Sequence, residues 1–534
     1  MSGDQADCVI VGGGHNALVA ATRLADRGWE VVVCESAATV GGAVASRVED
    51  GWISDEYSAC YPLARVSPAL TDLDLHHHGL VWCDTERVVT HVADEHDPEG
   101  SAILRDPDAT AAKLDADAPG DGDAWLHLVA GFQRIREPLM AALLTQWPPT
   151  TSGLAVVRAA GLRHLPDLSR LALLSVEDLG RERFADTRAR DLLTGNALHA
   201  DIHPAAPGSG LYGWLMSMLA QTVGFPVPRG GAGALAAALA SRARTAGATL
   251  RTSTPVAGIE VSGGRAVGVR LADCGRIRAR HAVIANTSAT ALYGRLLPQD
   301  AVPDGLRQRL ARFRHDAPTV KLTYRLARPL PWLARAARGA TVVHLGGDTA
   351  SLARWADDLA DGTIPRRPFA LLGQMTTADP TRSPAGTETM WLYSHLPHGR
   401  TDPESVAALT TALTSQLDAL APGWSDAVLA VRVQGPAELA AGNANLELGA
   451  IAGGTAQLSQ QALWRPVAGL GGPRTHIAGL YLGSSAAHPG GGVHGAPGLL
   501  AAKAAWADAR PLTRPLGRAW VAASGAVART APLF

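Results

Sequence analysis

The chain has 534 residues, of which 47% are hydrophobic and 18% charged, and its formal net charge is -1 at pH 7. This composition is typical of a globular protein with a large core, and the length favours two large domains over one. The sequence has no basic bias and no run of charges, which argues against binding of nucleic acid and against attraction to an anionic membrane.

The five cysteines form no C-x-x-C pair and their number is odd, which argues against a disulfide scaffold and a dithiol redox centre. Reduced thiols fit a cytoplasmic protein, and the N-terminal residues lack the basic and apolar segments of an export signal. Residues 204–228 carry no charged side chain but contain several glycines, so we expect a buried segment rather than a membrane span.

The first elements along the chain form one strand–helix–strand unit. Residues 7–11 predict an apolar strand that enters three glycines, residues 17–25 have helical spacing, and residues 30–34 predict a valine-rich strand. From about residue 70 to residue 219, Asp-Pro and Asp-Gly breaks separate helical stretches such as 125–144. We therefore expect a mostly helical insertion there, without further strand–helix–strand repeats.

The second half of the chain alternates helices and strands again. The expected helices are residues 234–246 and 403–420, and the expected strands are residues 249–251, 256–261, 266–271, 282–285, 320–326, 389–394 and 480–482. The last strand enters a glycine-rich loop and an alanine-rich helix. This order predicts an α/β nucleotide domain that a second domain interrupts twice.

The turn after the first strand carries the motif with the clearest chemistry. Gly12-Gly-Gly-His-Asn-Ala fits G-x-G-x-x-G/A, in which Gly12 makes the turn and Gly14 lets a pyrophosphate approach the backbone. Ala17 is small enough for close packing of helix and strand, and the helix N-terminus favours phosphate. Glu35 ends the second strand, where an acid accepts hydrogen bonds from ribose hydroxyls.

Two further glycine segments support a dinucleotide site. The pair Gly41-Gly42 lets the backbone pass close to a diphosphate, although an ordinary turn explains it equally well. Residues 483–498 (GSSAAHPGGGVHGAPG) lie between a strand and a helix, and such a loop can bind phosphate or the pyrimidine edge of a flavin. Residues 231–236 also fit the glycine fingerprint, but prolines precede them, so we expect only a helix start and no NAD(P) domain.

Taken together, these segments resemble the phytoene-desaturase-type flavoproteins of the FAD-dependent amine-oxidase superfamily. Within that superfamily the chain is most similar to the group called pyridine nucleotide-disulfide oxidoreductase domain-containing proteins. The similarity spans nearly the whole chain and is most specific in the segment HPGGGVHGAPG at residues 488–498. The family often has Gly at position 17, and amine oxidases typically have Arg where this chain has Ala43, which weakens the amine-oxidase reading.

The resemblance implies a three-layer, Rossmann-like FAD domain of the glutathione-reductase type with a mixed α+β substrate domain. We expect the FAD domain in residues 1–70, 228–295 and 470–510, the substrate domain in residues 71–227 and 296–469, and a C-terminal tail in residues 511–534. The residues expected to contact FAD are Gly12, Gly13, Gly14, Asn16, Ala17, Glu35, Gly41, Gly42, Val256, Gly483, Ser484, His488, Pro489, Gly490, Gly491, Gly492 and Val493.

Candidates for substrate contact are fewer, and no catalytic acid or base stands out. Leu211 to Leu219 is rich in methionine and aromatic residues, which fill cores but also line adaptable apolar pockets. The candidates are Tyr212, Trp214, Met218, Lys321 and His395, although a structural role explains each of them equally well or better. No metal is expected, because the adjacent histidines 76–78 point in different directions and have no matching acids.

The expected function is FAD-dependent hydride transfer on a largely apolar organic substrate, by a dehydrogenase, desaturase or isomerase. A flavin amine oxidase and a non-catalytic FAD-binding interaction protein are the alternatives. The tail from Arg510 onward has arginines and no acid, so it is a candidate for peripheral contact with a membrane surface. The sequence does not indicate the electron acceptor or the oligomeric state.

Overall fold

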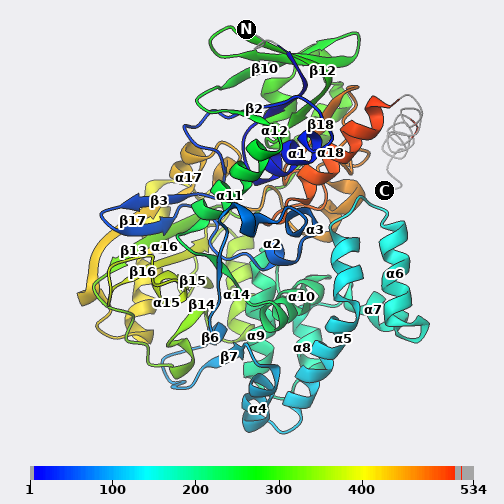
Figure 1. Ribbon diagram of the computed structural model, residues 1–534. Coiled ribbons are helices and arrows are strands. Elements are labelled where there is room, and N and C mark those ends of the chain that lie inside the picture. The colour runs from blue at the N-terminus through cyan, green and yellow to red at the C-terminus, as the bar shows by residue number, and fades with distance from the viewer. Residues whose placement is uncertain (1–4, 511–518, 520–534) are drawn as a thin grey trace.

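The computed structural model describes residues 5–510 and residue 519. Two seven-stranded sheets organise the chain, the first at the top and the second at the lower left of Figure 1. A group of helices lies at the lower right of the same view. The C-terminal tail, residues 511–534, falls outside the described residues except for Ala519.

The first sheet has a parallel centre with strand order β18-β12-β1-β2-β9, and β10 and β11 extend it from β12 in antiparallel pairing. Its strands are β1 (Gln5–Val11), β2 (Val31–Cys34), β9 (Thr249–Arg251), β10 (Val256–Ser262), β11 (Arg265–Leu271), β12 (Arg276–Ala285) and β18 (Leu480–Leu482). The predicted α/β fold and its opening strand–helix–strand unit are confirmed.

Side chains of the parallel strands alternate between two hydrophobic cores. Cys8 and Ile10 of β1 pack on one face against α1 (His15–Ala25), α11 (Ala232–Thr245) and α18 (Ala496–Ala509). Val9 and Val11 pack on the other face against β10 to β12 and residues 289–310. The short helices on that face are α12 (Ala289–Ala291) and α13 (Asp304–Leu310).

The second sheet has strand order β17-β13-β16-β15-β14-β6-β7, and only β14 and β6 are parallel. Its strands are β17 (Val428–Gln434), β13 (Thr319–Leu326), β16 (Glu388–His395), β15 (Ala370–Gln374), β14 (Ala340–Leu345), β6 (Arg87–Val92) and β7 (Ser101–Leu104). One face packs on α16 (Pro403–Leu420), and the other faces the helical region.

The region from residue 70 to residue 219 is less purely helical than its sequence predicts, because it contributes β6 and β7 to the second sheet. The valine-rich β6 is short and pairs with the nearby β7 and with the distant β14, and its short local pattern did not reveal it. The helices are α4 (Pro107–Asp117), α5 (Asp121–Leu143), α6 (Thr150–Ala160), α7 (Leu165–Leu171), α8 (Val176–Arg183), α9 (Thr187–Ala197) and α10 (Ser209–Thr222), and α14 (Thr349–Ala360) packs against them.

The charge-free stretch 204–228 forms α10, which is mostly buried, as predicted. Within the part of the chain that the structure describes, no helix has the length and apolar character needed to cross a membrane. Smaller elements complete the connections: β3 (Ser46–Glu49), β4 (Trp52–Asp55), α2 (Pro62–Val66), α3 (Pro68–Thr71), β5 (Trp82–Cys83), β8 (Val227–Pro228), α15 (Met375–Ala378) and α17 (Pro436–Gly442).

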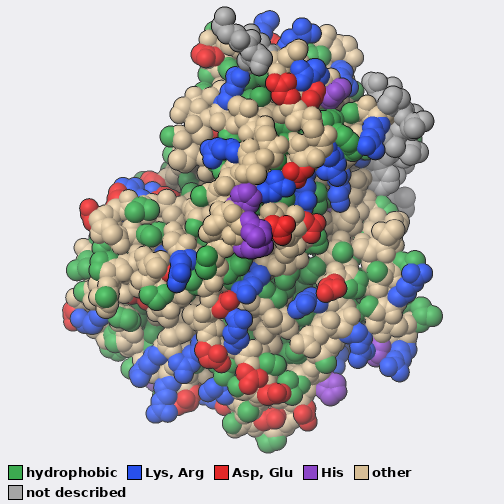
Figure 2. Space-filling model, viewed as in Figure 1, with side chains coloured by type: hydrophobic (Ala, Val, Ile, Leu, Met, Phe, Trp, Pro, Cys, Tyr) green, Lys and Arg blue, Asp and Glu red, His purple; other side chains and the backbone are tan. Residues whose placement is uncertain are grey.

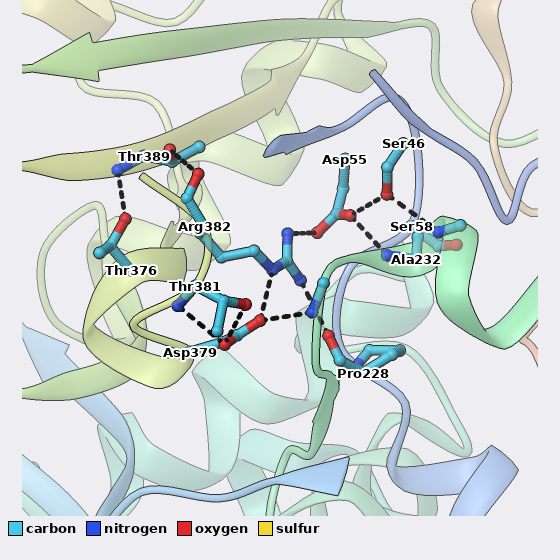
Figure 3. Close-up of polar contacts among 12 residues, drawn as sticks. Ser46, Asp55, Ser58, Pro228, Ala232, Thr376, Asp379, Thr381, Arg382 and Thr389 are labelled. Carbon is cyan, nitrogen blue, oxygen red and sulfur yellow. Dashed lines mark hydrogen bonds and ion pairs between the residues drawn. The ribbon is translucent and has the colours of Figure 1, made fainter. Parts of the chain in front are cut away.

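A buried charge network joins the two sheets (Figure 3). The Arg382 side chain is 0% exposed and donates to Asp55 (Nη1 to Oδ2, 2.9 Å) and Asp379 (Nε to Oδ2, 3.1 Å). The same two carboxylates accept the backbone N–H groups of Ala232 (2.7 Å) and Gly230 (2.7 Å) at the start of α11. Arg382 precedes β16 and α11 packs on the first sheet, so the network fixes one sheet against the other.

We expect Arg382→Met to lower the free energy of unfolding by about 3–5 kcal/mol, because it leaves two buried carboxylates without their cation. The matched control is Arg242→Met, since Arg242 pairs with Asp26 at the partly exposed surface (Nη2 to Oδ2, 2.7 Å). Loss of such a pair costs about 1 kcal/mol or less. Urea unfolding of both variants gives the comparison, and equal destabilisation would contradict the structural role of the network.

Candidate functional site

The glycine turn after β1 is free of side chains because there is no room for them. Gly12 has a φ of +88°, and a Cβ there would lie 2.9 Å from the carbonyl oxygen of Asn286. A Cβ on Gly14 would lie 2.8 Å from Asn286 Oδ1. Gly14 caps α1 without a side chain, so the first-turn N–H groups of the helix face the turn unblocked. Asn16 and Ala17 in that first turn are buried.

Glu35 lies beside this turn, where the sequence predicted it. It follows β2, and its carboxylate accepts the N–H groups of Gly13 (2.6 Å) and Ala37 (2.8 Å). The backbone carbonyl of Glu35 accepts the N–H of Thr254 (2.8 Å), which brings the segment leading to Val256 and β10 to the same end of the sheet. The carboxylate is thus held in place at the carboxyl ends of the parallel strands.

The pair Gly41-Gly42 lies directly against the first glycine turn. The N–H of Gly41 donates to the carbonyl of Gly13 (2.9 Å), and a Cβ on Gly42 would lie 3.0 Å from Gly14 Cα. A Cβ on Gly41 would lie 2.5 Å from the Val44 carbonyl oxygen. The two glycine segments therefore form one continuous surface of bare backbone next to the N-terminus of α1.

The C-terminal glycine loop starts at the same edge of the sheet. The N–H of Gly483 donates to the carbonyl of Ala285 (2.8 Å), and the Ser484 hydroxyl donates to the carbonyl of Thr287 (2.6 Å). The helix that leaves the loop, α18, packs tightly on α1, because a Cβ on Gly498 would lie 1.8 Å from the Asn16 carbonyl oxygen. Two helix N-termini thus converge, and their partial positive charges add.

The middle of this loop is covered by other segments. His488 Nε2 donates to the Thr145 carbonyl (2.8 Å) at the end of α5, and a Cβ on Gly491 would lie 2.5 Å from the Ala452 carbonyl oxygen. Gly492 approaches Leu63, and Val493 packs into the core of the first sheet. Pro489 and Gly490 complete the turn, with the Gly490 N–H donating to the Ala487 carbonyl (2.9 Å).

Two residues that the sequence analysis missed hold these parts together. Asn286 follows β12, donates through Nδ2 to the Gly483 carbonyl (2.9 Å) and lies against Gly12 and Gly14. Its position at the carboxyl end of a central parallel strand was the available signal. Arg465 is buried under the loop and donates to backbone carbonyls, including that of Ser485 (2.9 Å). Burial lowers the pKa of Arg465 to about 10. No local pattern in the sequence marked it.

The candidate substrate residues divide into two groups. Lys321 on β13 and His395 on the neighbouring β16 lie on one face of the second sheet, because Thr319 pairs with His395 and side chains alternate. Lys321 Nζ donates to the backbone carbonyls of Asp55 (2.6 Å) and Tyr57 (3.0 Å), and burial lowers the pKa of Lys321 to about 8.

His395 forms a buried pair with Asp201 (Nε2 to Oδ1, 2.8 Å), and its Nδ1 lies 3.1 Å from the Ala317 carbonyl oxygen. Burial acts to lower the pKa of His395, but the adjacent Asp201 charge raises it overall. Both ring nitrogens face acceptors, so the geometry favours the protonated ring.

The second group lies on α10. Trp214 and Met218 pack into the core between the helices and the second sheet, with Trp214 edge-on to Phe132 at 5.4 Å between ring centroids. Tyr212 instead points its hydroxyl to the Ala456 carbonyl (3.1 Å). The described residues contain no metal-binding cluster of His, Cys, Asp or Glu side chains, and the described cysteines are all unpaired.

Comparison with known proteins identifies the family. Residues 18–504 match the flavin-containing amine oxidoreductases. The chain belongs to this family. It is an enzyme, an FAD-dependent oxidoreductase, as its sequence predicted. The bare glycine surface, two helix N-termini and Glu35 fit this cofactor, since they provide close backbone approach, positive potential for phosphate and an acceptor for ribose hydroxyls.

The alignments with individual relatives extend over most of this flavoenzyme. Pyridine nucleotide-disulfide oxidoreductase domain-containing protein 2 of Mus musculus is 28% identical over 94% of this chain and 93% of its own length. The zeta-carotene-forming phytoene desaturase of Myxococcus xanthus is 26% identical over 74% of this chain and 73% of its own length. An oxidoreductase structure from Methanosarcina mazei has a TM-score of 0.60 at 17% identity, covering 93% of this chain and 99% of that chain, and supports the fold alone.

We expect Gly498→Ala to lower the free energy of unfolding by about 1–3 kcal/mol or more, because its Cβ would force α1 and α18 apart. The matched control is Gly131→Ala on α5, where a Cβ meets nothing within 4 Å. That exposed helical substitution should be neutral or stabilise the protein by up to about 1 kcal/mol. Urea unfolding tests both, and an unaffected Gly498→Ala variant would show that the two helices do not need this contact.

A pH dependence follows from His494, which is buried and accepts the Ala496 N–H at Nδ1 (3.2 Å). Burial lowers the pKa of His494 from 6.5 to about 4. As the pH falls, the unfolded chain takes up the proton first, so the stability present above about pH 6.5 is lost progressively towards pH 4.

We expect His494→Gln to reduce the fall in unfolding free energy between pH 7 and pH 4 by about 2–3 kcal/mol. The exposed His77, replaced by Gln, serves as the control and should leave the pH dependence as it is in the wild type. Unfolding measured across this pH range would refute the assignment if His494→Gln and wild type lost stability in parallel.

Proposed function

We propose that FAD lies across the carboxyl ends of the parallel strands, in a domain of the glutathione-reductase type made of residues 1–70, 228–295 and 470–510. The parallel centre with its antiparallel extension β10–β11 supports that domain type. The observation that carries the proposal is the continuous bare surface of Gly12, Gly14, Gly41 and Gly42 between Glu35 and the start of α1. Residues 71–227 and 296–469 then form the substrate domain.

Each part of the site has a separate task in this proposal. The first-turn N–H groups of α1, including those of Asn16 and Ala17, bind the pyrophosphate, and Glu35 binds the adenosine ribose. We assign the backbone of Val256 to the adenosine end, because Thr254, two residues earlier, donates to the Glu35 carbonyl. The loop from Gly483 to Val493 holds the isoalloxazine ring. Bound FAD supplies a flavin that accepts or donates hydride. The N-terminus of α18 and Arg465 place positive potential at this loop, which favours negative charge on the pyrimidine edge.

We propose a largely apolar organic substrate, as in a dehydrogenase, desaturase or isomerase. The sheet face that carries Lys321 and His395 is covered by apolar helices, and the partly exposed Leu211 and Met216 of α10 contribute to that cover. Tyr212 on the same helix points to the Ala456 carbonyl. Trp214 and Met218 lie in the core behind this cover. The phytoene desaturase among the relatives supports an apolar substrate class. An amine oxidase is the second candidate, favoured by the family match and by the buried Lys321.

The decisive experiment is an anaerobic titration of the purified holoenzyme with candidate substrates, followed by flavin absorbance. We expect polyenes or other apolar C–H donors to bleach the flavin and primary amines to leave it oxidised. Bleaching by amines alone would establish the amine-oxidase alternative. NADH and NADPH at micromolar concentrations should give no rapid, saturable reduction of the flavin. The glycine fingerprint at residues 231–236 begins α11, but the strand before it, β8, pairs with β5 and does not belong to the first sheet.

The FAD assignment is tested by Glu35→Ala. We expect FAD affinity to fall by about 1.5–3 kcal/mol, or roughly 10- to 100-fold, because a charge-assisted hydrogen bond to the ribose is lost. Glu30→Ala is the matched control, since Glu30 precedes the same strand, β2, at its opposite end and pairs there with Arg280. Fluorescence titration of the apoprotein with FAD measures both affinities, and unchanged binding to the Glu35 variant would rule out the ribose role.

A further inference from the structure

The segment from residue 143 to residue 174 is unusual because most of its apolar side chains are only partly buried or are exposed. Every leucine, valine and tryptophan in this segment is at least partly exposed, whereas the neighbouring α8 to α10 bury theirs in the helical core. The most exposed are Leu162 at 76%, Leu173 at 66%, Leu154 at 50% and Trp147 at 40%. Leu154 lies on α6, whereas Trp147, Leu162 and Leu173 lie on the turns before α6, between α6 and α7, and after α7.

The charges of the same surface have one sign over most of its length. Residues 138–166 contain no Asp or Glu, and the exposed arginines there are Arg158 and Arg163. Within the described part of the chain, neither arginine forms an ion pair. Figure 2 shows hydrophobic and basic side chains at the right-hand edge, where Figure 1 places α6 and α7.

Apolar side chains with a tryptophan and unpaired arginines match the boundary between the headgroups and acyl chains of an anionic bilayer. An interface with another protein would need apolar area of defined shape, whereas these apolar side chains are spread over α6 and the turns around α6 and α7. α6 has 11 residues, which is too short to cross a bilayer but suits a helix lying in its surface.

We propose that α6, α7 and the turns beside them form the surface by which this flavoenzyme docks on a membrane that contains anionic lipid. We call it the α6–α7 surface and define it by Trp147, Leu154, Arg158, Leu162, Arg163 and Leu173. The chain that leads into it contacts the glycine loop, because the carbonyl of Thr145, two residues before Trp147, accepts the His488 side chain (2.8 Å). The docking itself does not depend on the proposed substrate.

The test is co-sedimentation of the full-length holoenzyme with two kinds of vesicle, phosphatidylcholine alone and phosphatidylcholine mixed with phosphatidylglycerol. We expect binding to the mixed vesicles that weakens at high salt, and weaker binding to phosphatidylcholine alone. Leu154→Gln/Leu162→Gln should reduce partitioning into mixed vesicles by about tenfold or more. Arg158→Gln/Arg163→Gln should reduce it about tenfold, and only where phosphatidylglycerol is present.

The matched control is Leu429→Gln/Val431→Gln, which alters an equally exposed apolar pair (59% and 50%) on the edge strand β17. It should bind vesicles like the wild type. Flavin absorbance and thermal unfolding show whether each variant is folded. If the leucine variant is not folded, the variant of the two exposed arginines still tests the proposal.

The proposal is overturned if the wild type stays in the supernatant with both vesicles, or if the leucine and arginine variants bind as well as the wild type. It is also overturned if the β17 control loses binding to the same extent. Concentration-dependent self-association without lipid that disappears in the leucine variant would identify the α6–α7 surface as a contact between protein copies instead.

Discussion

Burial of charge at the junction of the two sheets constrains the rest of the molecule. A guanidinium and two carboxylates removed from water are tolerated only when each finds its partners, so the positions of Arg382, Asp55 and Asp379 leave little freedom (Figure 3). Asp55 lies just beyond Gly41-Gly42 along the chain, and its backbone carbonyl also accepts Lys321 Nζ. One network therefore relates the glycine surface of the first sheet to the candidate substrate face of the second.

Local pattern was enough to predict the secondary structure of the candidate site where that site is local in sequence. Gly12 to Glu35 form one strand–turn–helix–strand unit, and each residue type has its own steric or electrostatic reason there. The loop from Gly483 was recognised because a run of glycines between a strand and a helix has few other uses. In both cases the chemistry is carried by backbone groups, which glycine spacing reveals directly.

The other parts of the fold and of the candidate site depend on contacts between segments that are far apart in the sequence. Asn286 becomes a hub only because β12 lies between β1 and β18, and Arg465 matters because its loop folds under residues 485–490. β6 needs β14, which lies far along the chain, as its partner. For the same reason, the sequence of a methionine-rich helix such as α10 does not show whether the helix fills a core or lines a cavity. The structure shows that Trp214 packs in the core, whereas the Tyr212 hydroxyl donates to the Ala456 carbonyl.

Whole-chain charge does not describe the charge of each local surface. A net charge of -1 argues against attraction to anionic lipid only if the charges are evenly mixed, and here the acids are absent from residues 138–166. The sequence analysis placed the candidate membrane contact in the tail, from basic residues alone. Exposure of leucine is the additional information in the structure, because basic residues attract a membrane surface but apolar side chains hold a protein in it. Under the proposed docking, the enzyme would be held where the proposed apolar substrate is concentrated.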